Sequence, residues 1–198
     1  MFMYSRIIVK SQAKESLKGK WGIAIGTFIV NALIMGAINL VPGVGQVGGL
    51  VLAGVFNVGM SIVYLEIIRG WNCQFEDMFK GFNNFGTNCL AGILTTVYTI
   101  LWTLLFIIPG IVKSFSYAMT PYILADHPEM SPSEAITASR IMMDGNKGKL
   151  FVLYLSFIGW FLLCIVPFVF LYVTPYISAS VAKFYDTIKD EKNFTQPL

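Results

Sequence analysis

The sequence predicts an all-α, polytopic membrane protein with six transmembrane helices arranged as three helical hairpins. Three observations support this fold class: the composition, the length of the apolar stretches, and the prolines that separate these stretches in pairs. Of the 198 residues, 56% are hydrophobic and 13% are charged, and the mean hydropathy is +0.67. Soluble domains carry about 25% charged residues, so this chain has too little charge to cover the surface of a soluble globule.

The apolar stretches have the length that a bilayer requires, since a transmembrane helix needs about 20 mainly apolar residues. Six stretches meet this requirement: residues 22–41, 44–68, 88–108, 110–126, 150–166 and 168–185. A proline separates the two members of each pair, at Pro42, Pro109 and Pro167. Proline lacks a backbone N–H and disfavours helical backbone in the residue before it. The pattern therefore predicts three hairpins that turn at these prolines.

A more polar segment precedes each hairpin and is predicted to form an interfacial amphipathic helix on the cytoplasmic face. Within residues 74–85, Phe75, Met78, Phe79 and Phe82 follow a helical spacing, while acidic and basic residues occupy the opposite side. Residues 131–145 begin with Ser131 and Glu134, the spacing of a helical capping box. The first segment, residues 4–20, carries basic residues at successive spacings of four. These residues are predicted to contact anionic lipid headgroups at the membrane surface: Arg6, Lys10, Lys14 and Lys18.

The whole chain, residues 1–198, reads as a single membrane domain. Three internal units are suggested, 4–70, 74–126 and 131–188, each made of an interfacial helix followed by a hairpin. The sequence Thr120-Pro121-Tyr122 recurs as Thr174-Pro175-Tyr176. The first unit has no such element, so three unrelated hairpins remain the alternative.

The basic residues predict the orientation in the membrane. Of the 14 Lys and Arg residues, all except Lys113 are assigned to one side, because they precede, separate or follow the predicted hairpins or, in the case of Lys183, lie at the end of the sixth span. Positive charge is retained on the cytoplasmic side, and the N-terminus lacks the pattern of a cleaved signal peptide. We therefore expect a multi-pass protein of the cytoplasmic membrane with both termini in the cytoplasm. Glu66 and Arg69, at i and i+3, are expected to pair with each other at the end of the second span.

The candidate ligand-binding residues lie just after the second proline turn and in the sixth span. Lys113 is a cation beside an apolar turn, and such a residue either contacts a ligand or extends its ammonium group to the headgroups. The hydroxyl-bearing residues of the fourth and sixth spans either pack the helices or line a shared polar cavity. The predicted site comprises Lys113, Ser116, Tyr117, Tyr122 and Tyr176.

Residues that carry enzymatic chemistry are scarce. His127 is the one histidine, and the three cysteines, Cys73, Cys89 and Cys164, are far apart. Neither pattern predicts a metal site or a catalytic group. We therefore expect a protein that is not an enzyme, with no cofactor and no metal. The expected partners are membrane lipids, and other membrane proteins or a second copy of the chain, but not nucleic acid.

The central block of the chain, residues 107–119, reads Ile-Ile-Pro-Gly-Ile-Val-Lys-Ser-Phe-Ser-Tyr-Ala-Met and is followed by residues 122–126, Tyr-Ile-Leu-Ala-Asp. With residues 133–136, 149–151 and 155–160, it resembles a family of bacterial integral membrane proteins catalogued as domain of unknown function 975. That family is in turn similar to the membrane domain of some glycerophosphodiester phosphodiesterases, which implies a connection with lipids. The family has no established activity, so the resemblance implies no catalytic residues.

Two functions from different classes fit these observations. The first is a non-enzymatic protein that binds lipid or another amphipathic ligand, or that supports a membrane complex. The second is a small transporter or channel with a polar path between the fourth and sixth spans. An intramembrane enzyme that modifies lipids is a third and weaker alternative.

Overall fold

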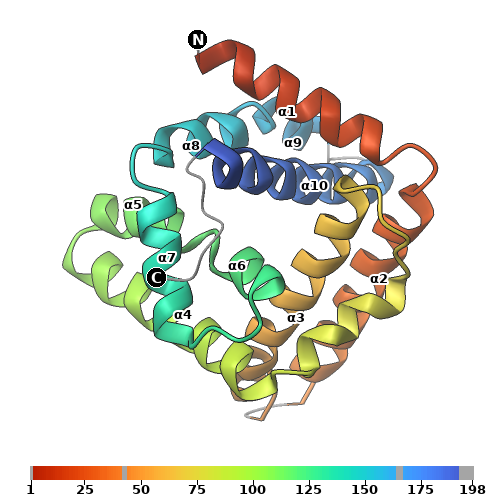
Figure 1. Cartoon of the computed structure of the whole chain (residues 1–198). Helices are drawn as coiled ribbons and strands as arrows, with labels where there is room; N and C mark the ends of the chain where they lie inside the picture. Colours follow the sequence, from red (N-terminus) through yellow and green to blue (C-terminus); the bar gives the residue numbers. More distant parts are fainter. Residues whose placement is uncertain (1, 42–43, 164–166, 192–198) are drawn as a thin grey trace.

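The computed structural model describes residues 2–41, 44–163 and 167–191, and every regular element in these ranges is a helix (Figure 1). The all-α class is therefore confirmed for the described part of the chain. The elements are α1 (Phe2–Ser16), α2 (Trp21–Asn39), α3 (Val44–Ile68), the 3-10 helix η1 (Phe75–Phe82), α4 (Phe85–Leu105), α5 (Ile107–Tyr117), α6 (Thr120–Asp126), α7 (Pro132–Met142), α8 (Lys147–Leu155), α9 (Ile158–Leu163) and α10 (Pro167–Glu191).

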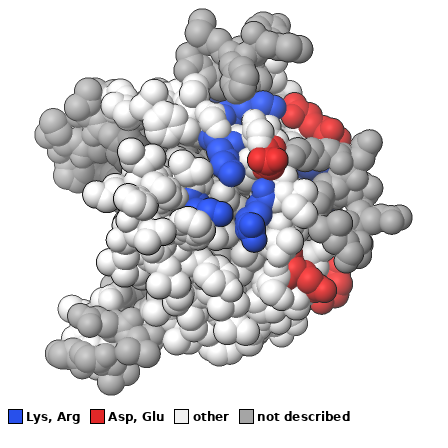
Figure 2. Space-filling view, turned by 90° about the vertical axis from the view of Figure 1, so that its left-hand side faces the viewer, with Lys and Arg blue, Asp and Glu red and all other residues white. Residues whose placement is uncertain are grey.

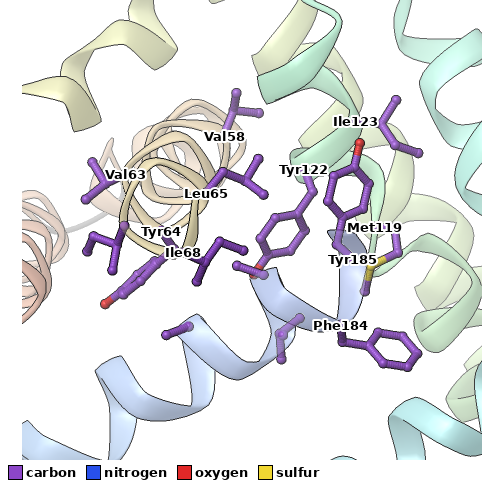
Figure 3. Packing of buried hydrophobic residues seen from close by; sticks show 14 of the residues in the cluster. Val58, Val63, Tyr64, Leu65, Ile68, Met119, Tyr122, Ile123, Phe184 and Tyr185 are labelled. Atoms are coloured by element: carbon purple, nitrogen blue, oxygen red, sulfur yellow. The ribbon is translucent and has the colours of Figure 1, made fainter. Parts of the chain in front are cut away.

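Helix α3 is the centre of the fold, since α2, α4, α6, α10 and η1 all pack against it. Figure 3 shows the core where α3, α6 and α10 meet, with Leu65 of α3 on the side of Tyr122 of α6 and Tyr185 of α10, whereas Tyr64 points away from these two rings. The rings of Tyr122 and Tyr185 stack with their centroids 5.6 Å apart. The burial of these large side chains contributes hydrophobic stabilisation where the three helices meet.

Three helices of the described ranges are long and apolar enough to cross a membrane: α2, residues 48–68 of α3, and α4. Helix α3 is mostly enclosed by its neighbours, whereas few residues of α2 and α4 are buried, and α4 exposes most of its apolar side chains. At their far ends Leu40 is 81% exposed and Leu104 is 79% exposed. Apolar surface of this extent is unfavourable in water and favourable against lipid tails. These helices therefore indicate a membrane protein.

The second predicted hairpin differs from the structure in the position of its turn. Helix α4 ends at Leu105, and Phe106 adopts an extended backbone with φ −157° and ψ 135°. Pro109 lies inside the first turn of α5, where a missing N–H leaves no helical hydrogen bond unmade. The break therefore precedes the proline by three residues. Residues 42–43 of the first predicted turn lie outside the described residues, as does Val166 of the third, whereas Pro167 is the first residue of α10.

The predicted spans 110–126 and 150–166 are broken helices, so the structure provides no single long helix for either. The first is divided between α5 and α6, and the second between α8 and α9 in its described part. At the first break Ser139 of α7 donates from Oγ to the Ser116 carbonyl, 2.8 Å away, and accepts from the Met119 N–H at 3.2 Å. At the second break the Lys10 ammonium of α1 lies 3.4 Å from the Ser156 carbonyl. Both breaks are stabilised because another helix satisfies freed backbone groups.

The three amphipathic segments form helices that pack within the fold. Helix α7 has the predicted capping box, with the Ser131 N–H donating to the Glu134 carboxylate at 2.8 Å. However, α7 packs against α4, α5 and α6 and buries one whole face. The segment 74–85 forms η1, a 3-10 helix that lies directly on α3. Gly59 of α3 and Gly81 of η1 permit this approach, since a Cβ atom at either position would collide with the opposite backbone.

Candidate functional site

A cavity of about 590 Å³ lies among the helices, walled by α2, α3, α4, α5, α6, α8 and α10. This volume lies within the range of about 300–1,000 Å³ that small-molecule sites occupy. Its lining contains no Asp, Glu, Lys, Arg or His. The lining residues are Phe28, Asn31, Asn57, Met60, Ser61, Tyr64, Thr95, Thr96, Thr99, Ile100, Ser114, Tyr117, Ala118, Pro121, Tyr122, Tyr154, Thr174, Ser178 and Val181.

Several serine and threonine hydroxyl groups of this cavity use their protons within their own helices, whereas the Tyr64 hydroxyl of α3 donates to the Ala24 carbonyl of α2 at 3.4 Å. In α4, Thr96 donates to the Gly92 carbonyl at 2.8 Å, and Thr99 donates to the Thr95 carbonyl at 2.7 Å. In α3, Ser61 donates to the Asn57 carbonyl at 2.8 Å. A hydroxyl oxygen that donates in this way keeps its lone pairs as acceptors. The side-chain oxygen of Asn31 is buried without a hydrogen-bond partner in the described residues. The cavity wall is therefore uncharged and rich in hydrogen-bond acceptors.

Aromatic rings form much of the remaining wall. Tyr64, Tyr117, Tyr122 and Tyr154 line the cavity together with Phe28. Aromatic rings supply apolar contact area, and tyrosine adds a polar group at one end. A wall of this kind suits a ligand that carries both apolar and polar parts.

The structure separates the five predicted ligand-binding residues into three places. Tyr117 and Tyr122 line the cavity. Lys113 and Ser116 line a second pocket on the other side of α5. Tyr176 lies elsewhere, because its ring packs edge-on against Phe157 at 5.3 Å between centroids and its hydroxyl donates to the Lys10 carbonyl at 3.2 Å. The prediction that these residues bind a ligand stays a prediction.

The predicted site omitted the hydroxyl stripe of α4. Thr95, Thr96 and Thr99 lie on one side of this mainly apolar helix, and all three line the cavity. Their spacing of one and four residues places them on one helical face, so the sequence contained a usable signal.

The four residues predicted for the membrane surface also occupy different environments. Lys14 and Lys18 are exposed. Lys10 is partly buried, with its ammonium 4.0 Å from the centroid of the Phe157 ring. It therefore binds within the fold through a cation–π contact. The side chain of Arg6 lies outside the described residues.

A charged cluster joins the ends of α3, α6 and α10, formed by Arg69, Asp126, Tyr185, Asp186 and Lys189. Arg69 donates to both carboxylate oxygens of Asp126, at 2.7 and 2.8 Å, and to Asp186 at 2.7 Å. Lys189 donates to Asp126 at 2.7 Å. The hydrogen bonds to Asp126 raise the pKa of Arg69. Burial by itself raises the pKa of Asp126, but the hydrogen bonds from Arg69 and Lys189 outweigh it and lower that pKa to about 2.

The expected pair between Glu66 and Arg69 is therefore wrong. The Glu66 carboxylate binds the Lys80 ammonium of η1 at 3.0 Å, and Arg69 turns to α6 and α10. Arg69 directly follows α3, and its side chain extends to the carboxylates of Asp126 and Asp186 on neighbouring helices and not back to Glu66. The two charged groups thus tie α3 to different neighbours.

In the described part of the chain no three His, Cys, Asp or Glu side chains lie close enough together to hold a metal ion. His127 has its Nδ1 3.2 Å from a Glu129 carboxylate oxygen in an exposed loop. Cys73 is buried and Cys89 is partly buried, both as free thiols, and Cys164 lies outside the described residues.

The fold and the cavity define an all-helical protein with three helices able to span a membrane and an uncharged polar cavity between its helices. The chain belongs to the family described as "Protein of unknown function (DUF975)", which matches residues 1–116 and 106–192. No curated protein and no solved structure matches the chain. The similarity to the membrane domain of glycerophosphodiester phosphodiesterases stays a prediction.

Proposed function

We propose that this protein resides in the cytoplasmic membrane, is not an enzyme, and binds an amphipathic ligand, a membrane lipid, in the cavity among its helices. The cavity itself is the observation that carries the proposal. Its wall combines hydroxyl and amide oxygens with aromatic rings and contains no charged side chain. Such a wall accepts an uncharged polar group together with adjoining hydrocarbon. Two helices of its wall, α2 and α4, are long and apolar enough to cross a membrane and have few buried residues, so we expect a ligand to enter from the bilayer.

The proposal includes six membrane traversals with both termini in the cytoplasm, of which the fourth and fifth are broken helices. Contacts between the ends of the helices support this part. Asp126 after the fourth traversal and Asp186 in α10 both bind Arg69, which follows α3. The Ser16 hydroxyl at the end of α1 lies 3.5 Å from the Ile68 carbonyl. The ends of four segments therefore gather at one face, and we assign that face to the cytoplasm because positive charge is retained there.

Native mass spectrometry of the gently solubilised protein tests ligand binding. The wild-type protein should retain a bound species with the mass of a lipid. Thr96→Phe should reduce the retained fraction because the larger ring enters the cavity. Val97→Phe is the matched control, since this neighbouring residue is exposed and does not line the cavity. A lipid-free wild-type monomer, or equal retention by the two variants, would contradict the proposal.

Transport is the second candidate function, and the position of the cavity favours it. Pro121 and Thr174 both line the cavity, so it lies between the segments that were expected to form a polar path. Proline within α10, at Pro175, frees backbone carbonyl groups near the same region. A proteoliposome assay tests transport. If the protein is a transporter, the ligand identified by mass spectrometry should cross the proteoliposome bilayer. A ligand that stays bound and does not cross would leave binding as the function.

A further inference from the structure

A second pocket, of about 430 Å³, gathers three basic residues from separate helices. Lys113 comes from α5, Arg140 from α7 and Lys147 from the start of α8. In the orientation predicted from the sequence, Lys113 is the one basic residue that does not lie on the cytoplasmic side. The structure instead places it beside Arg140 and Lys147, because α5 is short and turns this side toward α7 and α8. Figure 2 shows several basic side chains near one another on the face that carries α5, with acidic side chains beside them and a broad uncharged surface over the rest of the face.

The three basic groups of this pocket have no carboxylate at ion-pair distance in the described residues. The ion pairs of the described chain use Arg69, Lys80, His127, Lys149 and Lys189 instead. Lys113 contacts the face of the Trp102 ring, with its ammonium 4.6 Å from the centroid. This contact orients the ammonium group but does not neutralise its charge.

The other polar groups of the pocket leave its charge positive. Ser116 donates to the Val112 carbonyl at 3.1 Å, and Thr137 donates to the Ser133 carbonyl at 2.8 Å. Asp144 contributes one carboxylate to the wall and has interactions of its own. Three cations against one carboxylate give the pocket an excess of positive charge and of hydrogen-bond donors.

The framework around the pocket is fixed by buried contacts. Ser139 binds α7 to the end of α5 through the Ser116 carbonyl. The turn before α8 contains Gly145, whose φ of +77° is a conformation that glycine adopts without strain. Asn146 is buried in this turn and donates to the Met142 carbonyl at 3.1 Å. The three basic residues therefore extend from helices whose relative positions are held before any ligand arrives, which reduces the entropy lost on binding.

We propose that this pocket binds a phosphate group, carried by a lipid headgroup or by a soluble phosphate ester. Arginine binds phosphate oxygens in a bidentate manner, and lysine ammonium groups add charge. The pocket is distinct from the cavity of the proposed function, since Ser114 and Tyr117 line the cavity while Lys113 and Ser116 line this pocket. Either site can therefore exist without the other.

Titration calorimetry with the purified full chain tests the proposal. The probes are inorganic phosphate, a short-chain phosphatidylglycerol and the short-chain phosphatidylcholine of the same acyl length. The wild type should bind phosphatidylglycerol, phosphate or both more tightly than phosphatidylcholine. Lys113→Gln with Arg140→Gln should weaken this binding at least about tenfold, because two charge-assisted hydrogen bonds are lost.

Lys149→Gln with Lys183→Gln is the matched control, because it removes the same charge from residues that neither line this pocket nor belong to the predicted membrane-surface set. This control should keep wild-type affinity, as should the charge-preserving variant Arg140→Lys within a few fold. Binding of phosphatidylglycerol alone assigns the site to a lipid headgroup, and binding of inorganic phosphate as well assigns it to phosphate esters in general. Equal loss in both double variants, or no binding of any anionic probe by a wild-type protein that unfolds cooperatively, overturns the proposal. Lys147→Gln provides a further single-site variant if the double variant does not fold.

Discussion

The guanidinium group of Arg69 binds both carboxylate oxygens of Asp126, with Nη1 to Oδ1 at 2.7 Å and Nη2 to Oδ2 at 2.8 Å. The two residues are 57 positions apart in the chain, directly after α3 and at the last residue of α6. Asp186 of α10 binds the same guanidinium group. One arginine thus fixes the ends of three helices that surround the core and the cavity.

Replacement of Arg69 should destabilise the protein. Arg69→Gln leaves Asp126 and Asp186 without their shared partner, and both carboxylates are largely buried. We expect a loss of about 1.5–3 kcal/mol in the free energy of unfolding, the range for a hydrogen bond to a charged group. Thermal unfolding in detergent measures this loss. Arg140→Gln, which removes an exposed arginine, is the control and should change the unfolding temperature little. Similar effects of the two variants would contradict a role for the cluster.

The same cluster predicts a dependence of stability on pH. The pKa of Asp126 is lowered from 3.8 to about 2 in the folded protein. A depressed pKa contributes stability that is complete above the pKa of the unfolded chain and is lost as the pH falls toward the folded pKa. Stability should therefore fall between about pH 5 and pH 2. Asp126→Asn should be less stable than the wild type at pH 7 and should show a shallower fall in this window. An unchanged slope would show that other carboxylates dominate.

The contact between α3 and η1 depends on two glycines. Gly59→Ala should reduce the free energy of unfolding by about 1–3 kcal/mol or more, the range for an overpacked interior, because its Cβ would meet the Met78 backbone. Gly26→Ala of α2 is the control, since a Cβ there meets no atom within 4 Å. Thermal unfolding of both variants measures the difference, and a Gly59→Ala variant as stable as Gly26→Ala would exclude the observed packing.

The proposed orientation can be tested with an impermeant thiol reagent on intact cells. Cys73 is only 3% exposed and is a poor target for the reagent, so the native cysteines are first replaced by alanine. Glu76→Cys places an exposed thiol on η1, at the proposed cytoplasmic face, and should react only after permeabilisation. Leu40→Cys places one at the opposite end of α2 and should react without it. The reverse labelling pattern would show that the proposed orientation is wrong and that η1 faces the outside of the cell.

Composition and hydropathy predict the helical class and the three long apolar helices, because lipid exposure requires continuous apolar surface. They do not predict where the fourth and fifth apolar stretches break. The break between α5 and α6 depends on Ser139, and the break between α8 and α9 depends on Lys10, and both residues are distant in sequence. Local propensity contains no information about such tertiary partners.

The candidate sites also contain some residues that could be predicted from the sequence and others that could not. Tyr117 and Tyr122 could be predicted as cavity residues from the hydroxyl-bearing sequence around the break. The three threonines of α4 show a readable stripe, which the predicted site omitted. The meeting of Lys113 with Arg140 and Lys147 could not be predicted, because it depends on how α5, α7 and α8 pack. The partners of Arg69, Asp126 and Asp186, could not be predicted from the sequence either, because they depend on how α6 and α10 pack against α3.

A structure of the protein determined in lipid nanodiscs by electron cryomicroscopy tests the central claim most directly. We expect an elongated density within the cavity, with its polar end near the side chains of Asn31, Thr99 and Tyr122. A continuous water-filled path through the cavity to both membrane faces, with no such density, would contradict ligand binding and favour transport.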